Sequence, residues 1–185
     1  AEIEFKQSYP EIYNHILQFK NQLQKRNKEE TGIRYEWYAM QRCANTYYPE
    51  FEKEKILWQG VAKRIEFCYD EQGHFCDVTA FIMTGKNLKY FLAILNSVFF
   101  QYTLLNIYLE GDTFKSKNQI LQNFPVPDIS EKEQKPFIDI VSSIIDLKKS
   151  TPNADTSALE KQIDEMVYKL YDLTEEEIKI IEGNE

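Results

Sequence analysis

The sequence predicts an α+β fold: a small mixed or antiparallel β-sheet with a hairpin packs on a central buried helix, and a C-terminal helical hairpin follows. Apolar residues recur at three- and four-residue steps through residues 88–109, a spacing that lines a helix face. Two earlier segments, at residues 55–59 and 65–83, have the apolar and aromatic composition of strands. Amphipathic helical patterns follow at residues 131–149 and 156–170.

The length and composition suit one globular domain with an appendage. The chain has 185 residues, 43% hydrophobic and 14% aromatic, so it can bury a sizeable core. Changes in pattern divide it into an N-terminal helix at residues 1–30, a central domain at 31–127 and a C-terminal helical region at 128–185. No secretion signal opens the sequence and its three cysteines form no C-x-x-C pair, so we expect a cytoplasmic protein.

The negative charge is concentrated at one end of the chain. The net charge is -8, from 30 acidic and 22 basic residues. Residues 1–30 carry five of each sign, residues 31–127 carry ten of each, and residues 128–185 carry fifteen acids and seven bases. The central domain can therefore present a basic face although the whole chain is acidic.

The N-terminal segment combines a helix with aromatic residues. Residues 8–28 are predicted to form one helix, with Ser8 as the N-cap and Pro10 in the first turn. The run from 33 to 40 has the composition of a short strand. We interpret Trp37 and Trp58 as core or boundary aromatics, because such rings bury a large apolar area.

Residues 65–83 are predicted to form a β-hairpin. Its turn is the polar cluster from Asp70 to His74, which lies between two apolar runs. This hairpin would place Cys68 opposite Cys76. We interpret them as two small apolar residues in a cross-strand pair, with a disulfide or metal ligation as the alternatives.

The stretch from Leu88 to Leu109 is the longest apolar segment. It is apolar around most of a helix, which indicates burial in a core or in a membrane. We reject the membrane because polar residues are spread along a span that barely reaches the required ~20 residues. They are Lys89, Asn96, Ser97, Gln101 and Asn106. We expect a single central helix, ended by Gly111.

The acidic C-terminal region reads as helices with clear start signals. Ser130 and Glu133 form a capping box for a helix from about 131 to 149, which either kinks at Pro136 or begins properly there. A second helix from about 156 to 170 faces it as a helical hairpin. Thr174 and Glu177 cap a last short helix.

The residues that known catalytic chemistries require do not come together in this sequence. Its six glycines form no G-x-G cofactor loop, and no N-P-P-Y-type pocket for methyl transfer to amino groups is present. The charged runs 52–55 and 70–71 lack the further carboxylate that a metal-dependent nuclease needs, so we interpret them as solvated charge. His74, Cys68 and Cys76 give only three of the four ligands of structural zinc. We therefore expect no catalytic residue, metal or cofactor in this chain.

An ordered series of motifs resembles a known family. Leu-Asn-Ser at 95–97 lies in the apolar helix, and a glycine, a basic loop and Ile-Leu-x-x-Phe-Pro-Val-Pro at 120–127 follow, before Glu133-Gln134 and an amphipathic helix. Further matching motifs are Trp37-Tyr38, Gln41-Arg42, YYPEFEKEKILW at 47–58 and YDEQGHFCDVTAFIMTG at 69–85. Over roughly residues 8–149 the chain resembles the TaqI-like C-terminal specificity (target-recognition) domain of restriction-modification adenine methyltransferases, which is related to the specificity subunits of type I systems.

Three basic or amide-rich segments of the chain could contact DNA. Base edges are read by guanidinium and amide groups, and phosphates are bound by Lys, Ser and backbone amides. The candidates lie in the loop after Trp37, before the predicted hairpin and after the central helix. They are Arg34, Gln41, Arg42, Asn45, Lys63, Arg64, Lys115, Ser116, Lys117 and Asn118.

The resemblance implies a DNA target-recognition domain at residues 31–127, whose partners are double-stranded DNA and a methyltransferase catalytic domain of the same polypeptide or complex. That domain would bind S-adenosylmethionine, and an endonuclease accompanies it in fused enzymes of this type. The acidic helices would dock on the rest of the enzyme, because their charge repels phosphates. Two alternatives stay open at this point: a protein-interaction module that docks a partner through its apolar helices, and a self-contained hydrolase.

Overall fold

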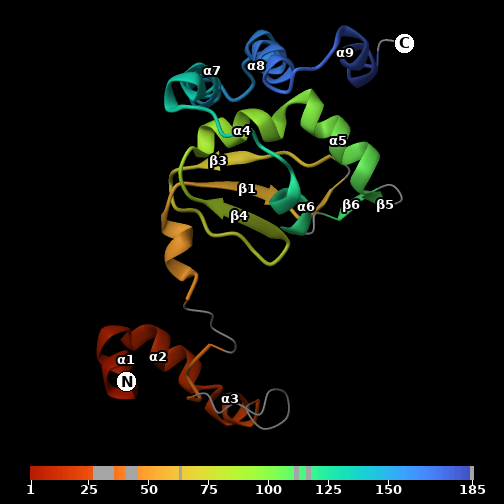
Figure 1. Cartoon of the computed structure of the whole chain (residues 1–185). Helices are drawn as coiled ribbons and strands as arrows, with labels where there is room; N and C mark the ends of the chain where they lie inside the picture. Colours follow the sequence, from red (N-terminus) through yellow and green to blue (C-terminus); the bar gives the residue numbers. More distant parts are fainter. Residues whose placement is uncertain (27–35, 41–45, 63, 111–112, 116–117, 184–185) are drawn as a thin grey trace. The chain divides into compact units, whose positions relative to one another are not determined.

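A computed structural model describes residues 1–26, 36–40, 46–62, 64–110, 113–115 and 118–183 of the chain. Figure 1 shows its helices and strands. The chain divides into two compact units, Ala1–Tyr48 and Pro49–Glu185.

The described residues of the first unit form three short α-helices where the sequence pattern predicts one. They are α1 (Glu2–Ser8), α2 (Pro10–Leu17) and α3 (Lys20–Lys25). The prediction of a single helix over 8–28 is wrong, because α2 and α3 are separate helices and the backbone of Phe19 between them is non-helical, with φ -101° and ψ 6°. Pro10 opens α2 as expected, but the N-cap is Tyr9, since Ser8 is the last residue of α1. The strand expected at 33–40 is also wrong where it can be judged, since residues 36–40 form a turn; residues 33–35 lie outside the described part.

Trp37 forms the small core of this first unit. Its side chain is only 6% exposed, and its indole Nε1 donates a hydrogen bond of 2.9 Å to a carboxylate oxygen of Glu2. The hydroxyl of Tyr13 donates to the same oxygen at 3.1 Å, and the ammonium of Lys20 lies 4.7 Å from the centroid of the indole ring. The interpretation of Trp37 as a core aromatic is confirmed.

The second unit contains a three-stranded antiparallel sheet, which we call sheet A. Its strand order is β3 (Cys68–Asp70), β1 (Lys55–Gln59) and β4 (Ala80–Thr84). The strand expected at 55–59 is confirmed. The predicted hairpin is wrong, because β1 lies between β3 and β4 and pairs with both. Cys68 is therefore opposite Leu57 and not Cys76, and both cysteines are free.

The two faces of sheet A differ in what covers them. Residues that are directly opposite in antiparallel strands share a face, and successive residues alternate between faces. Ile56 and Trp58, each at most 6% exposed, belong with Phe81 and Met83 to the face that joins the hydrophobic core. We call the other side the outer face; its residues are Lys55, Leu57, Gln59, Cys68, Asp70, Ala80, Ile82 and Thr84.

A second small sheet, sheet B, continues directly from β1. It consists of β2 (Val61–Ala62), β6 (Thr113–Lys115) and β5 (Leu109–Glu110), in that order. Only Gly60 separates β1 from β2. A Cβ atom on Gly60 would lie 2.6 Å from a ring carbon of Phe81 and 3.2 Å from the carbonyl oxygen of Thr79. The chain therefore needs glycine where it passes from one sheet to the other.

Two helices form the apolar stretch that the sequence predicts as one. They are α4 (Leu88–Asn96) and α5 (Val98–Tyr108), bent by 61°. Ser97 breaks the run: its backbone is extended, with φ -65° and ψ 153°, and its hydroxyl accepts a hydrogen bond of 3.2 Å from the amide of Phe100. Asp164, far away in the sequence, accepts the amide hydrogen of Val98 at 2.8 Å. Both contacts cap the start of α5.

Among the described helices, none is by itself both long and apolar enough to cross a membrane. When α4 and the first part of α5 are taken together, the bent pair passes that test, by length and composition only.

The C-terminal helices follow a short helix, α6 (Asn118–Asn123), and an extended Pro-Val-Pro segment. They are α7 (Glu131–Ser150), α8 (Ser157–Leu170) and α9 (Glu175–Ile181). The capping boxes of α7 and α9 are both confirmed. Pro136 lies inside α7, so that helix begins at the capping box and not at the proline.

Two tyrosine hydroxyls hold the extended segment in place. Tyr90 on α4 donates a hydrogen bond of 2.8 Å to the carbonyl of Pro127, and Tyr171, just after α8, donates one of 2.9 Å to the carbonyl of Pro125. Burial is the main cause that raises the pKa of Tyr90 to about 12, so it remains a donor at neutral pH.

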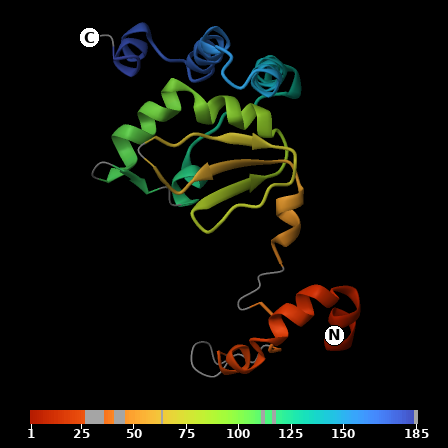
Figure 2. The same ribbon diagram turned by 180° about the vertical axis from the view of Figure 1, so that it is seen from behind.

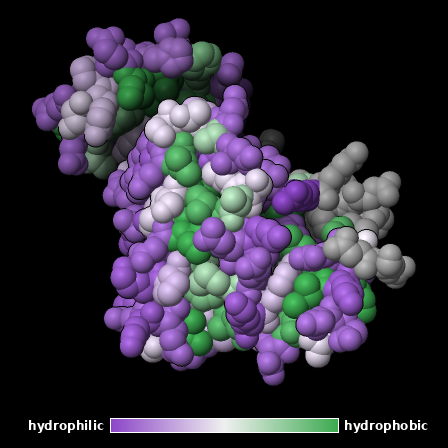
Figure 3. Space-filling model, turned by 90° about the horizontal axis from the view of Figure 1, so that it is seen from above, coloured by the Kyte–Doolittle hydropathy of each residue, from purple (hydrophilic) through white to green (hydrophobic). Residues whose placement is uncertain are grey.

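The second unit is thus an α+β structure in layers. Helices α4 and α5 lie between sheet A and the C-terminal helices, as the two opposite views show (Figures 1 and 2). The surface seen from the side of α7–α9 is mainly hydrophilic, with smaller apolar patches between the polar groups (Figure 3).

Truncation of the buried layer should destabilise the protein. Leu95 on α4 is 3% exposed within the core, and removal of a buried leucine side chain costs about 2–5 kcal/mol. We expect Leu95→Ala to lower the free energy of unfolding by this amount in a denaturant titration. The matched control is Leu105→Ala on α5, since Leu105 is 48% exposed; equal effects of the two substitutions would contradict the assignment of α4 as the buried layer.

Candidate nucleic-acid interface

The register of sheet B brings two distant segments of the chain together. Strand β2 pairs with β6 so that Val61 is opposite Lys115 and Ala62 is opposite Phe114. The segment at 61–64 and the segment at 113–118 are about fifty residues apart in the sequence, and each carries predicted DNA contacts. We call these two paired segments the basic corner.

The structure describes part of the predicted contact set. Arg64 is described and exposed, and the backbone is described at Lys115, the last residue of β6, and at Asn118, the first residue of α6. The other seven candidates lie outside the described residues: Arg34, Gln41, Arg42, Asn45, Lys63, Ser116 and Lys117. The predicted loop of residues 41–45 falls in the first unit, so its position relative to the basic corner stays a prediction.

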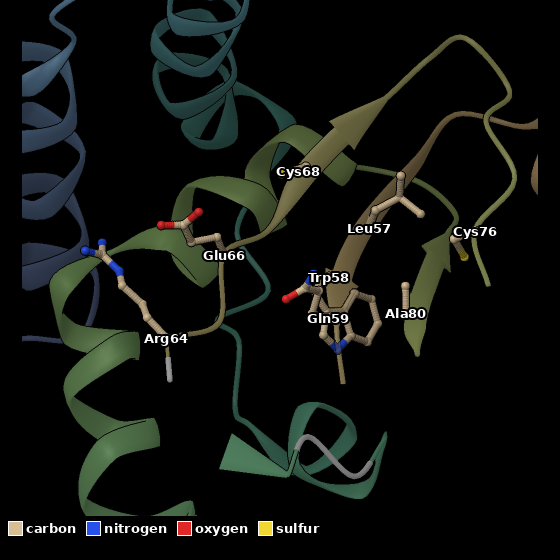
Figure 4. Close-up of a pocket in the computed structure, with 8 residues that line it drawn as sticks. All are labelled: Leu57, Trp58, Gln59, Arg64, Glu66, Cys68, Cys76 and Ala80. Atoms are coloured by element: carbon tan, nitrogen blue, oxygen red, sulfur yellow. The ribbon is translucent and has the colours of Figure 1, made fainter. Parts of the chain in front are cut away.

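Arg64 lies between two hollows of the surface. One, of about 390 Å³, is shown in Figure 4; it is on the outer face of sheet A and is lined by Leu57, Trp58, Gln59, Arg64, Glu66, Cys68, Cys76 and Ala80. The other, of about 490 Å³, extends between the α4–α5 bend and the helices α7 and α8. In Figure 4 the guanidinium of Arg64 points away from the first hollow, toward the C-terminal helices.

The second hollow has an apolar floor and a charged rim. Its charged lining residues are two bases, Arg64 and Lys148, and three acids, Glu66, Glu160 and Asp164. Burial raises the pKa of Asp164 above its usual value; the amide of Val98 lowers it, and the charges of Glu160 and Glu182 raise it further. Acidic residues outnumber basic ones around this hollow, which does not favour a phosphate there.

The opposite end of the outer face is closed by a buried ion pair. Lys55 is 0% exposed and Asp70 is 6% exposed, and their charged groups are in direct contact. The ammonium of Lys55 also donates to the carbonyl of Phe51 at 2.6 Å. The prediction that these two residues are solvated charge is wrong, because the turn after β3 and the segment before β1 cover them.

Hydrogen bonds lower the pKa of Asp70. Burial by itself would raise it, but bonds from Lys55 and His74 and from the backbone amides of Gln72 and His74 outweigh burial and hold the pKa of this carboxyl well below its usual range. The amides of Gln72 and His74 lie 3.0 and 2.9 Å from its oxygens. Asp70 thus organises the turn and closes the sheet, which is a structural role.

Gln59 was not among the predicted DNA contacts, although it borders the first hollow. This residue is the last of β1, is exposed and lies on the rim of the first hollow. The sequence does indicate its face, because side chains alternate along the strand Lys55–Gln59 and Gln59 therefore lies on the face opposite to Ile56 and Trp58. The sequence alone does not say which of the two faces is exposed to solvent, so it could not identify Gln59 as an exposed residue.

Comparison with protein families matches residues 2–126 to the TaqI-like C-terminal specificity domain. The match covers more than half of the chain, so the chain belongs to this family. The type II methyltransferase M.MjaIV of Methanocaldococcus jannaschii is 28% identical to the chain over 170 residues. The similarity covers 88% of this chain and 56% of that protein, so the chain spans about half the length of the curated relative it matches.

Proposed function

We propose that the chain is the sequence-specific DNA target-recognition module of a restriction-modification DNA adenine methyltransferase, with or without a fused endonuclease. Catalysis, and the binding of S-adenosylmethionine, would belong to a separate domain of the same polypeptide or complex. The family match and the similarity to a type II methyltransferase support this proposal. The observation that carries it is the pairing of β2 with β6 in the basic corner, which joins two segments that carry predicted DNA contacts.

The distribution of charge supports the same orientation. The C-terminal region, residues 128–185, carries the whole net charge of -8. Phosphates repel such a surface, so DNA would approach the basic corner, and α7–α9 would face the catalytic domain. Exposed apolar side chains on these helices, such as Leu147 at 41% and Ile180 at 52%, are compatible with protein contacts there.

A salt titration of DNA binding tests the proposal. In the complete enzyme we expect Lys115→Ala combined with Lys117→Ala to weaken duplex binding, because Lys115 ends β6 in the basic corner and Lys117 follows two residues later in the sequence. The slope of log affinity against log salt should become shallower by about 0.9 for each phosphate that the variant no longer binds. The stability of the protein should change little, because most substitutions outside the core have small effects, and a thermal midpoint of the variant checks this.

The matched control is Lys161→Ala combined with Lys169→Ala, two exposed lysines on α8, which should leave the salt slope unchanged. Should the basic-corner variant bind cognate and random duplexes like the wild type at every salt concentration, the corner is not at the DNA surface. Binding of a protein partner through apolar helices would instead respond little to salt.

A further inference from the structure

Gln59 has a polar side chain that no described part of the protein uses. It ends β1 with an exposed side chain, and within the described residues its amide group makes no hydrogen bond. By contrast, polar outer-face residues are engaged at the other end of sheet A: Lys55 on β1 is 0% exposed, and Thr84, opposite it on β4, donates a hydrogen bond of 2.6 Å to Glu50. The outer face of sheet A is thus closed at one end and open at the end where Gln59 lies.

The hollow beside Gln59 is mainly apolar. Leu57 and Ala80 belong to the outer face, and Cys76 lies in the segment before β4. Gln59 is directly opposite Ala80 in the strand register. Figure 4 shows Gln59 at the end of β1, with Leu57, Cys76 and Ala80 beside it. An amide donor and acceptor therefore stand next to an apolar depression of about 390 Å³.

This site adjoins the basic corner and is rigidly held. Gly60, the next residue, donates its amide hydrogen to the carbonyl of Thr79 at 2.8 Å. The side chain of Asp77 accepts the amide hydrogen of Thr79 at 2.8 Å and so fixes the turn that leads into β4. One residue beyond Gly60, Val61 pairs with Lys115. Binding residues on strands are positioned more accurately than those on loops, so Gln59 is well placed for direct readout.

The chemistry of this site matches one base pair in the DNA major groove. A glutamine amide can form two hydrogen bonds with adenine, to N6 and N7, and apolar groups contact the methyl group of thymine. Both features are exposed on the same edge of an A·T pair. We propose that Gln59 is a specificity-determining residue that reads the adenine of an A·T pair, and that the adjoining hollow receives the thymine methyl group. This inference rests on the proposed function.

Selection from a duplex library tests this inference. The complete enzyme, as wild type and as Gln59→Ala, is incubated with duplexes that carry a randomised central stretch, and the bound fraction is sequenced. We expect the wild type to prefer A·T at one position of the selected duplexes. Gln59→Ala should lose about 5- to 100-fold of the preference at that position. The salt slope of binding should not change, because the amide is uncharged.

Two further variants sharpen the result. Gln59→Glu can accept from the cytosine amino group but cannot donate to adenine N7, so the preference should move from A·T toward C·G at the same position. Gln162→Ala, an exposed glutamine on α8, should leave the preference unchanged at every position. Thermal midpoints close to that of the wild type show that each variant is folded.

The outcomes separate this inference from the proposed function. If Gln59→Ala keeps the wild-type preference at every position, or weakens all duplexes equally, Gln59 does not read a base and the inference is overturned. The proposed function survives that result if the lysine variant still flattens the salt slope. Both fail together if the wild type shows no sequence preference and no salt-dependent binding.

Discussion

Asp70→Ala should lower the free energy of unfolding by about 3–5 kcal/mol, because it leaves the ammonium of Lys55 buried without its counter-charge. Lys55 is 0% exposed and contacts Asp70 directly, so the charge that the substitution leaves unpaired lies away from solvent. The same substitution also removes the acceptor for the amides of Gln72 and His74. A urea titration at neutral pH measures the effect.

Two controls separate the buried pair from surface charge. Asp139→Ala removes an ion pair with Lys135 in which both side chains are more than half exposed, and it should change stability little. The double substitution Lys55→Met and Asp70→Leu should recover part of the loss, since no unpaired charge stays buried. A loss from Asp70→Ala as small as that from Asp139→Ala would contradict the buried pair.

The contribution of Asp70 to the free energy of unfolding should also depend on pH. Its pKa in the folded protein lies well below the usual 3.8, so the folded state binds the proton less readily than the unfolded state does. The stabilisation is therefore fully present above the unfolded pKa and is lost as the pH falls through the folded value. The difference between the wild type and Asp70→Ala should stay constant down to about pH 5 and shrink in stronger acid.

Phe100→Ala should have an effect of similar size, about 3–5 kcal/mol. Phe100 on α5 is 0% exposed, and its ring centroid lies 4.6 Å from that of Phe124 and 5.8 Å from that of Phe67. These three rings join α5 to the segment before β3 and to the residue that precedes Pro-Val-Pro. Phe100→Leu, which preserves more of the volume, should cost less; a loss below about 1 kcal/mol for Phe100→Ala would show that the ring is not at the centre of the core.

Local signals in the sequence predicted the elements whose ends are set by neighbouring residues. Ser130 with Glu133 and Thr174 with Glu177 define helix starts within four residues, and both capping boxes form. The run at 55–59 forms a strand as its apolar composition indicates. These features needed no knowledge of the rest of the fold.

Features decided by tertiary contacts could not be predicted in the same way. The apolar pattern runs unbroken through Ser97, but Asp164, sixty-six residues away, caps the new helix that starts at Val98. Periodicity indicates strands without naming their partners, so β1 could not be seen to separate β3 from β4. The burial of Lys55 depends on Asp70 from another strand. The open side of sheet A, and with it Gln59, was hidden for the same reason.

Amide hydrogen exchange of the complete enzyme, with and without duplex DNA at low ionic strength, tests the proposed role most directly. Exchange slows where bound DNA covers the backbone or stabilises it. The predicted result is protection of residues 59–64 and 113–118, with the solvent-facing amides of α7–α9 unchanged by DNA. Protection confined to α7–α9, or none in the second unit, would contradict DNA recognition through the basic corner.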